Sequence, residues 1–255
     1  MSVGLEPDGV ESALRALTGE AKRHRAVRHR YLKALAEGAL PDLRWAMVDF
    51  ARQYFGYSAH FPRYVSAVIS RLERADHRTA LLGNLTEESG IYSDEELGVL
   101  QSIGIEPAWV VGVPHTQLFY RFSSAIGVSD PCAGDDAIEV VCWREMFLSV
   151  LTNGSPAEAL GALGLGTEGI VRDIYLPFVA ALARLPGLAP SDIVFFPLHT
   201  AVDDDHQETL LDITRHYAGT EAGLLDVTKG MRKALALRSS FWDWMHERAL
   251  TLGQS

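Results

Sequence analysis

Two histidines and an aspartate recur at helical spacing in the segment FFPLHTAVDDDHQETLLDI. His199, Asp203 and His206 stand at positions i, i+4 and i+7, within roughly 60° of one another on one helical face. Imidazole and carboxylate ligands together suit a first-row transition metal such as iron or manganese. The apolar residues Phe195 and Phe196 indicate that part of this face is buried, where ionisable groups need a partner. The spacing therefore predicts a metal site, and a solvated polar face is the alternative.

A site for two metal ions needs further ligands from other helices. The candidates share an apolar or glycine-rich setting, and they are Glu87, Glu88, His115 and Glu168. A glutamate that only stabilises a helix N-terminus is the alternative for Glu168. Arg172 follows Glu168 by four residues on the same helical face, where it could bind a substrate carboxylate. An ion pair of Arg172 with Asp173 or Glu158 is the competing interpretation.

Helical periodicity dominates the chain and must position these residues. It predicts an all-α protein with a single domain over residues 1–255 and seven or eight helices. Only the short runs VVGV and DIVFF are candidates for strands. Ser93 and Glu96 form a capping-box pattern that opens a short helix. The other expected helices cover 10–37, 43–74 with a kink at Pro62, 76–89, 114–126, 135–151, 156–184, 190–217 and 221–250.

The composition narrows the class of protein. Its 23 Lys and Arg against 33 Asp and Glu give a net charge of −10, which argues against binding to nucleic acid or to anionic membranes. No apolar run approaches the ~20 residues of a transmembrane helix, and the N-terminus does not resemble a signal peptide. Two cysteines cannot form a disulfide framework, so a cytoplasmic protein is expected. The basic run AKRHRAVRHRY is expected to be solvated helix surface.

Four segments in order resemble the metal-ligand segments of the heme-oxygenase-like di-iron oxidases, relatives of the thiaminase II and PqqC-like fold. They are NLTEESG, PHTQLFYRFSSAIGV, GTEGIVRDIY and FFPLHTAVDDDH, within about residues 50–217. The resemblance implies a seven-helix fold without heme, two Fe(II) ions or a mixed Mn/Fe pair, and O2 as co-substrate. With Glu87 as an alternative to Glu88, it implies six metal ligands: Glu88, His115, Glu168, His199, Asp203 and His206.

An acidic insert separates Glu88 from His115 by 27 residues, more than in many members of this family. The insert resembles that of the N-oxygenating branch, in which an additional glutamate reaches a metal. Glu106 matches that glutamate by position, ahead of Glu95 and Glu96, and a helix first-turn residue is the alternative. The resemblance also implies a substrate pocket lined by three residues that could equally be aromatic core, namely Tyr54, Tyr57 and His60.

The resemblance predicts N-oxygenation of an amine or guanidine on a small amino-acid-like substrate in natural-product biosynthesis. An external electron donor is expected, and the sequence leaves open whether the chain forms a homodimer. The alternative reactions at the same di-iron site are oxidative C–C cleavage, decarboxylation and desaturation. A thiaminase-like hydrolase with Cys142 as nucleophile, or a metal-free binding protein, would belong to another class.

Overall fold

The computed structural model describes residues 4–251, without the side chains of residues 202–206. Within that range the chain is helical, and its one β-feature is an isolated bridge between Gly4 and Thr220, so the all-α prediction is confirmed. The helices are α1 (Pro7–Arg23), α2 (Arg30–Glu37), α3 (Leu43–Ser58), α4 (Phe61–Arg71), α5 (Ala75–Glu88), α6 (Asp94–Ser102), α7 (Pro107–Val110), α8 (His115–Ala125), α9 (Ile138–Asn153), α10 (Pro156–Leu160), η1 (Gly161–Glu168, a π-helix), α11 (Gly169–Leu182), α12 (Phe195–Tyr217) and α13 (Glu221–Thr251).

Several of the expected helices are divided into shorter ones. The segment 43–74 is interrupted after Ser58, and Pro62 lies in the first turn of α4, where its missing N–H costs nothing. The segment 156–184 is one continuous helical path, but its middle third is the π-helix η1. The capping box of Ser93 and Glu96 is present at the start of α6, as the sequence predicted.

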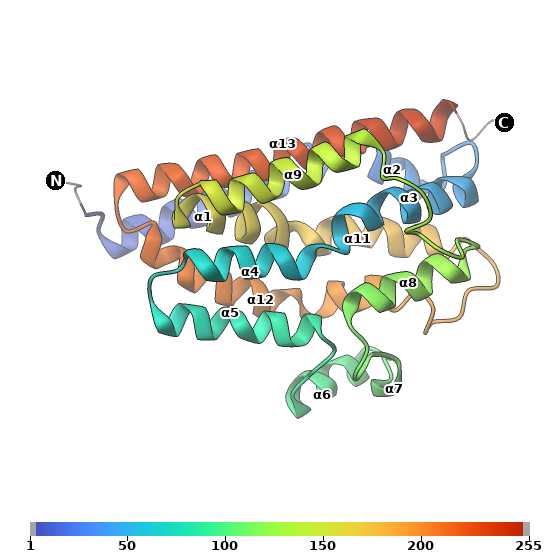
Figure 1. The fold of residues 1–255 in the computed structure, drawn as a ribbon, viewed down its shortest axis with the longest axis horizontal. Coiled ribbons are helices and arrows are strands. Elements are labelled where there is room, and N and C mark those ends of the chain that lie inside the picture. The colour runs from blue at the N-terminus through green and yellow to red at the C-terminus, as the bar shows by residue number, and fades with distance from the viewer. Residues whose placement is uncertain (1–3, 252–255) are drawn as a thin grey trace.

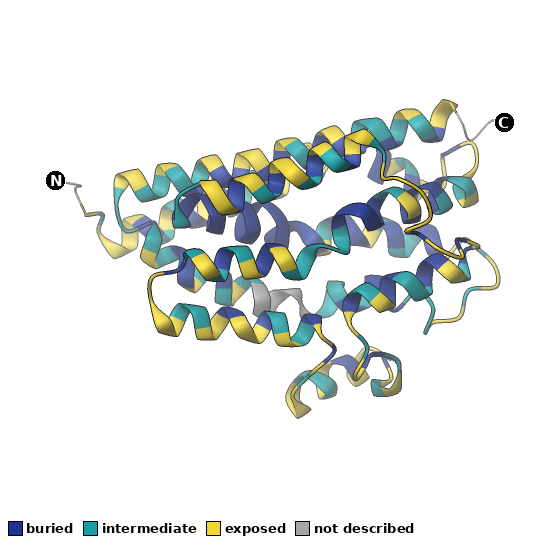
Figure 2. Cartoon of the chain, in the orientation of Figure 1, coloured by how far each residue is buried: buried dark blue, intermediate teal, exposed yellow. Residues whose placement is uncertain are grey.

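The helices pack as a bundle around one buried core (Figure 1). The long helix α13 runs along the bundle beside α9 and packs on α10 and η1, while α11 packs between α2 and α12. The helices α6 and α7 project from the bundle between α5 and α8 (Figure 1). Figure 2 shows that the outer helices bury only their inner faces, whereas segments in the middle of the bundle are buried throughout.

Glycines allow α13 and η1 to lie in backbone contact. A Cβ atom at Gly161 would lie 2.0 Å from the carbonyl oxygen of Val227, and one at Gly230 would lie 1.8 Å from that of Glu158. Both distances are far below van der Waals contact, so any side chain would force the helices apart. This close packing fixes the position of η1, whose eight residues are all buried.

Aromatic side chains from eight of the described helices fill the core. The rings of Phe50 and Phe178 have centroids 4.2 Å apart, and Tyr57 stacks on Trp143 at 3.7 Å with nearly parallel planes. Phe50 also contacts Trp242 of α13. Because these rings are buried and interlocked, they give a rigid wall from which neighbouring polar side chains can project.

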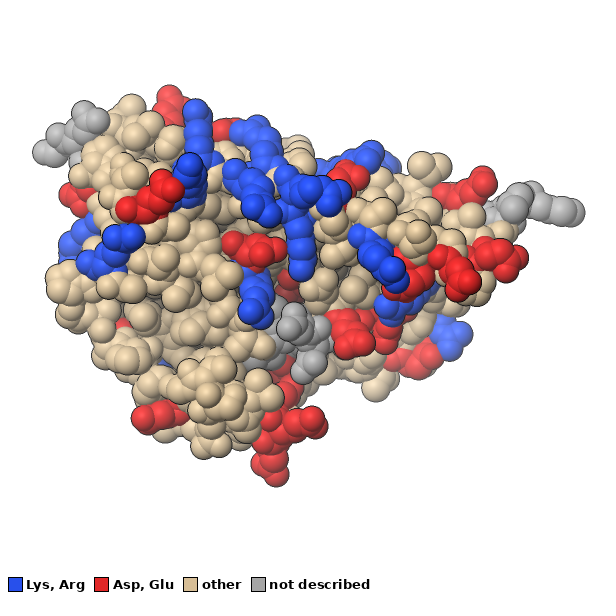
Figure 3. All heavy atoms as spheres, turned by 180° about the vertical axis from the view of Figure 1, so that it is seen from behind, with Lys and Arg blue, Asp and Glu red and all other residues tan. Residues whose placement is uncertain are grey.

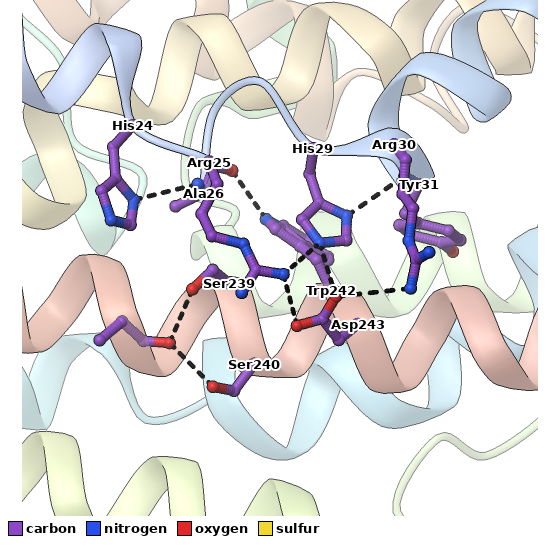
Figure 4. Close-up of polar contacts among 11 residues, drawn as sticks. His24, Arg25, Ala26, His29, Arg30, Tyr31, Ser239, Ser240, Trp242 and Asp243 are labelled. Atoms are coloured by element: carbon purple, nitrogen blue, oxygen red, sulfur yellow. Dashed lines mark hydrogen bonds and ion pairs between the residues drawn. The ribbon is translucent and has the colours of Figure 1, made fainter.

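The basic run that was expected on a helix surface instead forms the turn between α1 and α2 (Figure 4). Asp243 of α13 accepts hydrogen bonds from Arg25 at 2.5 Å and from His29 Nε2 at 3.2 Å. His29 also caps α2, since its Nδ1 accepts from the backbone N–H of Tyr31, and its side chain is only 3% exposed. The indole N–H of Trp242 donates to the carbonyl of Ala26, which fixes the turn to α13. The prediction of a solvated surface is therefore wrong for His29, because α13 supplies a tertiary partner.

We expect the free energy of unfolding to decrease as the pH falls below about 6.5, the ordinary histidine pKa. Burial lowers the pKa of His29, although Asp243 partly opposes the shift. The folded chain therefore binds this proton less readily than the unfolded chain, and stability present above pH 6.5 is lost as the pH falls towards the lowered pKa. Burial also lowers the pKa of other histidines, namely His24, His60, His77 and His246. Thermal melts between pH 7.5 and 5.5 measure the effect.

The variant His29→Asn provides a matched comparison for that pH dependence. Asparagine retains an acceptor for capping α2 but does not titrate in this range. The melting temperature of the variant should depend less steeply on pH than that of the wild type. An unchanged slope would show that His29 does not contribute to the acid sensitivity.

The charged surface is mixed in sign. Figure 3 shows basic and acidic side chains interspersed on the back face of the molecule. Ion pairs connect α13 to α1 and α3, with Arg232 donating to Glu20 at 2.7 and 3.0 Å and Arg248 to Asp49 at 2.8 and 2.6 Å. None of the helices in the described part of the chain combines the length and apolarity that crossing a membrane requires.

Candidate metal centre and substrate cavity

A partly open cavity lies among the helices of the bundle, and about 500 Å³ of non-atom space surrounds it when the adjoining open solvent is included. Helices α3, α4, α5, α8, α11, α12 and α13 and the π-helix η1 contribute side chains to it. The exposed surface of its walls is mainly apolar, although eleven of the fifteen lining residues also carry a polar or charged group. The lining residues with polar side chains are Tyr54, Tyr57, Ser58, Glu88, His115, Thr116, Thr167, Glu168, Tyr175, His199 and Arg238. An enclosure whose surface is mainly apolar and into which polar groups converge is the usual form of a small-molecule site.

The acidic insert, residues 89–114, folds back on itself and thereby brings Glu88 next to His115. Gly90, with a φ of 81°, turns the chain out of α5, and its carbonyl accepts a hydrogen bond from the N–H of Gly112 at 2.8 Å. A Cβ atom at Gly90 would lie 2.5 to 2.7 Å from the backbone of Val113, so only glycine allows the two ends of the insert to meet. Glu88, the last residue of α5, then lies against His115, the first residue of α8.

Glu88, His115 and His199 offer donor atoms that all lie within 4.8 Å of one another. The carboxylate oxygen Oε1 of Glu88 is 3.1 Å from Nδ1 of His115, and the rings of His115 and His199 have centroids 4.7 Å apart. Two donors on one first-row metal ion are separated by about 3.0 to 3.4 Å when the metal–ligand bonds are about 2.1 Å. Both the distance and the mixture of imidazole and carboxylate therefore fit iron.

Hydrogen bonds orient both imidazoles. Nδ1 of His199 donates to the carbonyl oxygen of Phe195 at 2.6 Å, so Nε2 carries the lone pair that can bind a metal. Nε2 of His115 lies 2.8 Å from the hydroxyl of Tyr92, which leaves Nδ1, facing Glu88, as the ligand atom. Burial and the nearby Glu88 raise the pKa of Tyr92, so its hydroxyl stays protonated. These contacts are of the kind that fixes histidine ligands around a metal.

Glu168 enters the same cavity from the end of η1. Its side chain is buried, and the π-helical backbone brings the hydroxyl of Thr167 to the carbonyl of Ala162, five residues earlier, at 3.0 Å. Short π-helical segments often occur at functional sites, where they re-aim side chains. Here the π-helix places both Thr167 and Glu168 on the cavity wall.

The other predicted site residues are divided between the cavity and the surface. Tyr54 and Tyr57 are buried and line the cavity, and their role in binding substrate remains a prediction. Three other predicted residues do not line the cavity: His60, Arg172 and Glu106. His60 contacts Arg63 at the start of α4, while Arg172 and Glu106 are exposed.

The structure distinguishes Glu88 from Glu87, but it does not test the predictions for Asp203 and His206. Glu88, not its neighbour Glu87, lines the cavity. Asp203 and His206 belong to α12, but their side chains lie outside the described residues. Cys142, the nucleophile of the hydrolase alternative, is exposed and does not line the cavity.

Arg238 is a candidate site residue that the sequence did not predict. It lies in the middle of α13, only 1% exposed, and lines the cavity. The apolar residues Leu235, Trp242 and Met245 stand three or four residues apart on the same buried helix face as Arg238. An arginine at that spacing within an apolar face was the signal that could have identified it, because arginine is almost never buried without a partner.

The family model of the iron-containing redox enzymes matches residues 48–239, three quarters of the chain. This protein therefore belongs to that family of iron-containing redox enzymes. The 4-chloro-allylglycine synthase of Streptantibioticus cattleyicolor is 23% identical over 242 residues, which cover 93% of this chain and 84% of that enzyme.

Solved structures with the same fold support the architecture. A domain from Shewanella denitrificans with a heme oxygenase-like fold matches with a TM-score of 0.70 at 14% identity, covering 98% of this chain and 96% of the other. A CADD-like protein from Nostoc punctiforme gives 0.71 at 14% identity, with 94% and 95% covered. A TenA homologue from Pseudomonas syringae gives 0.66 at 15% identity, with 97% and 98% covered. The chain thus has the heme oxygenase-like fold that its sequence motifs resembled.

Proposed function

We propose that the protein is a di-iron oxidase that uses O2 to oxidise a small amino acid. The observation that carries this proposal is the convergence of Glu88, His115 and His199 in one apolar cavity of an iron-containing redox enzyme. Glu168 projects into the same cavity. With Asp203 and His206, one and two turns after His199 on α12, these residues would make the six ligands expected for two iron ions.

The residues of the cavity have separable roles in this chemistry. A pair of ferrous ions would supply electrons to O2 and positions at which it can bind. Glu88, His115 and His199 would hold the metal, and Tyr92 would orient His115 through its hydrogen bond. Aromatic walls, including those of Phe119 and Phe195, would exclude water from the reacting groups. Reduction of O2 to two waters takes four electrons, so a two-electron oxidation of the substrate requires an external donor for the other two.

Such a site is compatible with N-oxygenation and with oxidative C–C cleavage or desaturation, and the observations support the second class better. N-oxygenation was expected because Glu106 of the insert could reach a metal, yet Glu106 is exposed at the start of α7 and does not line the cavity. The related synthase is named for an amino-acid product that carries an alkene. Oxidative C–C cleavage or desaturation of an amino acid is therefore the better supported reaction, and N-oxygenation is the alternative.

A single experiment tests the proposal and separates the two reactions. The protein is loaded anaerobically with Fe(II), given a reductant and O2, and assayed against a panel of L-amino acids that includes lysine, ornithine, arginine and norvaline. We expect amino-acid-stimulated O2 uptake and, by mass spectrometry, a product that has lost hydrogen or a carbon fragment. A product with one added oxygen on nitrogen, formed by the wild type and lost in Glu106→Ala, would instead establish N-oxygenation. Failure to bind iron, or O2 uptake that no amino acid stimulates, would refute the proposed function.

A further inference from the structure

Arg238 carries a buried positive charge in the substrate cavity. Its side chain is 1% exposed, and Nη1 lies 3.4 Å from the hydroxyl of Tyr54. The guanidinium carbon lies 5.6 Å from the ring centre of Tyr57 and 5.3 Å from that of Trp143. None of these three contacts is with an anion, and ring faces and a neutral hydroxyl compensate only part of the cost of burying a charge.

Unused hydrogen-bonding atoms lie around this charge. Nε of Arg238 and the hydroxyl of Tyr57 are buried and make no hydrogen bond to any residue in the described part of the chain. Buried polar atoms are almost always paired in proteins, and an orphaned pair therefore indicates a missing partner. A guanidinium offers donors in a planar fork that fits a carboxylate, and a phenol can donate to the same anion. Both residues line the cavity, so a ligand bound there can reach them.

Two tyrosines connect Arg238 to the metal centre. The hydroxyl of Tyr54, which contacts Arg238, lies 2.9 Å from the hydroxyl of Tyr175. The ring of Tyr175 meets that of His199 edge to face, with 5.6 Å between centroids. A molecule whose anionic end binds at Arg238 would extend past these tyrosines towards His199. The cavity can thus hold a small molecule by one end and present the other end to the metal ligands.

We propose that Arg238, with Tyr57, binds the carboxylate of the substrate and selects amino acids over the corresponding amines and amides. This inference rests on the proposed function for the identity of the substrate, but the anion site itself does not depend on iron. It also replaces Arg172, which is exposed, as the residue that anchors the substrate.

The test compares two probes that differ only in the carboxylate, L-norvaline and L-norvalinamide, with acetate as a minimal anion. Binding to the iron-free protein is measured by calorimetry and by the shift in melting temperature. We expect L-norvaline to bind at least about tenfold more tightly than its amide, because hydrogen bonds to a charged group are lost in the amide. Acetate should compete with L-norvaline. Equal affinity for acid and amide, or binding of neither L-norvaline nor acetate, would overturn the proposal.

Variants of Arg238 and Arg172 then show which residue is responsible for the preference for L-norvaline over L-norvalinamide. Arg238→Gln should abolish the preference for the acid over the amide, and Arg238→Lys should retain part of it because the charge remains. Arg172→Gln is the matched control and should keep the wild-type preference. Circular dichroism shows whether each variant is folded, and the comparison of probes on the wild type needs no variant. A preference lost in Arg172→Gln and kept in Arg238→Gln would refute the assignment.

The two proposals fail in distinguishable ways. Absence of iron binding or of amino-acid-stimulated O2 uptake would remove the oxidase, while the acid–amide comparison on iron-free protein would be unaffected. Iron binding and O2 uptake by a protein that does not distinguish acid from amide would remove only the role of Arg238.

Discussion

Replacing His199 by alanine should abolish iron binding while leaving the fold intact. The donor set of Glu88, His115 and His199 would lose one of its two described imidazoles. Loss of a residue that only orients a ligand typically costs about 10- to 100-fold in metal affinity, and loss of the ligand itself should cost more. The measurement is the iron content of protein that is loaded anaerobically with Fe(II) and then desalted.

The control for this variant is His216→Ala in the same helix. His216 is exposed near the end of α12, and its ring contacts those of His77 and Tyr217, not the cavity. Iron content should therefore equal that of the wild type. Both variants should keep the helical circular dichroism spectrum, because the ring contacts of His199 with His115 and Tyr175 are a small part of an extensive aromatic core. Wild-type iron content in His199→Ala would exclude His199 as a ligand.

Gly230→Ala should lower the free energy of unfolding by more than about 3 kcal/mol, the upper end of ordinary overpacking. The new Cβ would lie 1.8 Å from the carbonyl oxygen of Glu158 and 3.0 Å from the backbone nitrogen of Ala162. Both are backbone atoms, so relief requires α13 to move away from α10 and η1. At about 2 to 4 °C per kcal/mol for a chain of this size, the melting temperature should fall by roughly 10 °C. Iron content should fall as well, because η1 carries Glu168.

Gly83→Ala is the matched control, because it adds the same methyl group at a position where no neighbouring atom obstructs it. Gly83 lies in α5, and a Cβ atom there would meet nothing within 4 Å. Alanine should stabilise this helix by about 0.5 to 1 kcal/mol, since it restricts the unfolded chain and favours the helix. Thermal and urea unfolding of both variants measure the contrast. Similar stability of Gly230→Ala and the wild type would show that the helices can separate at little cost.

Much of the fold could be predicted because it depends on local patterns. Apolar residues at helical spacing predicted nearly every helical segment, and the capping box of Ser93 and Glu96 marked the start of α6. The breaks were harder to predict. The turn at residues 24–29 exists because Asp243 and Trp242 of α13 bind it, and the sequence around the turn does not contain that information.

The candidate site was likewise predictable in its residue types but not in its spatial arrangement. The residue types were present in the sequence, and Glu88, His115, Glu168 and His199 were identified by their chemistry and motif. Their meeting required the tertiary structure, because Gly90 closes the insert and brings residues 27 positions apart into contact. The exposure of Glu106 likewise follows from how the insert projects, which spacing alone does not reveal.

The sequence by itself determined that this protein is helical and which residue types could bind iron, since periodicity and ligand chemistry are properties of the residues. The tertiary structure decided which of those residues share a cavity, and it placed Arg238 there in preference to Arg172. The physical reason is that burial of a charge depends on which helices pack around it. That packing is governed by contacts between residues far apart in the chain, such as those of Gly161 and Gly230.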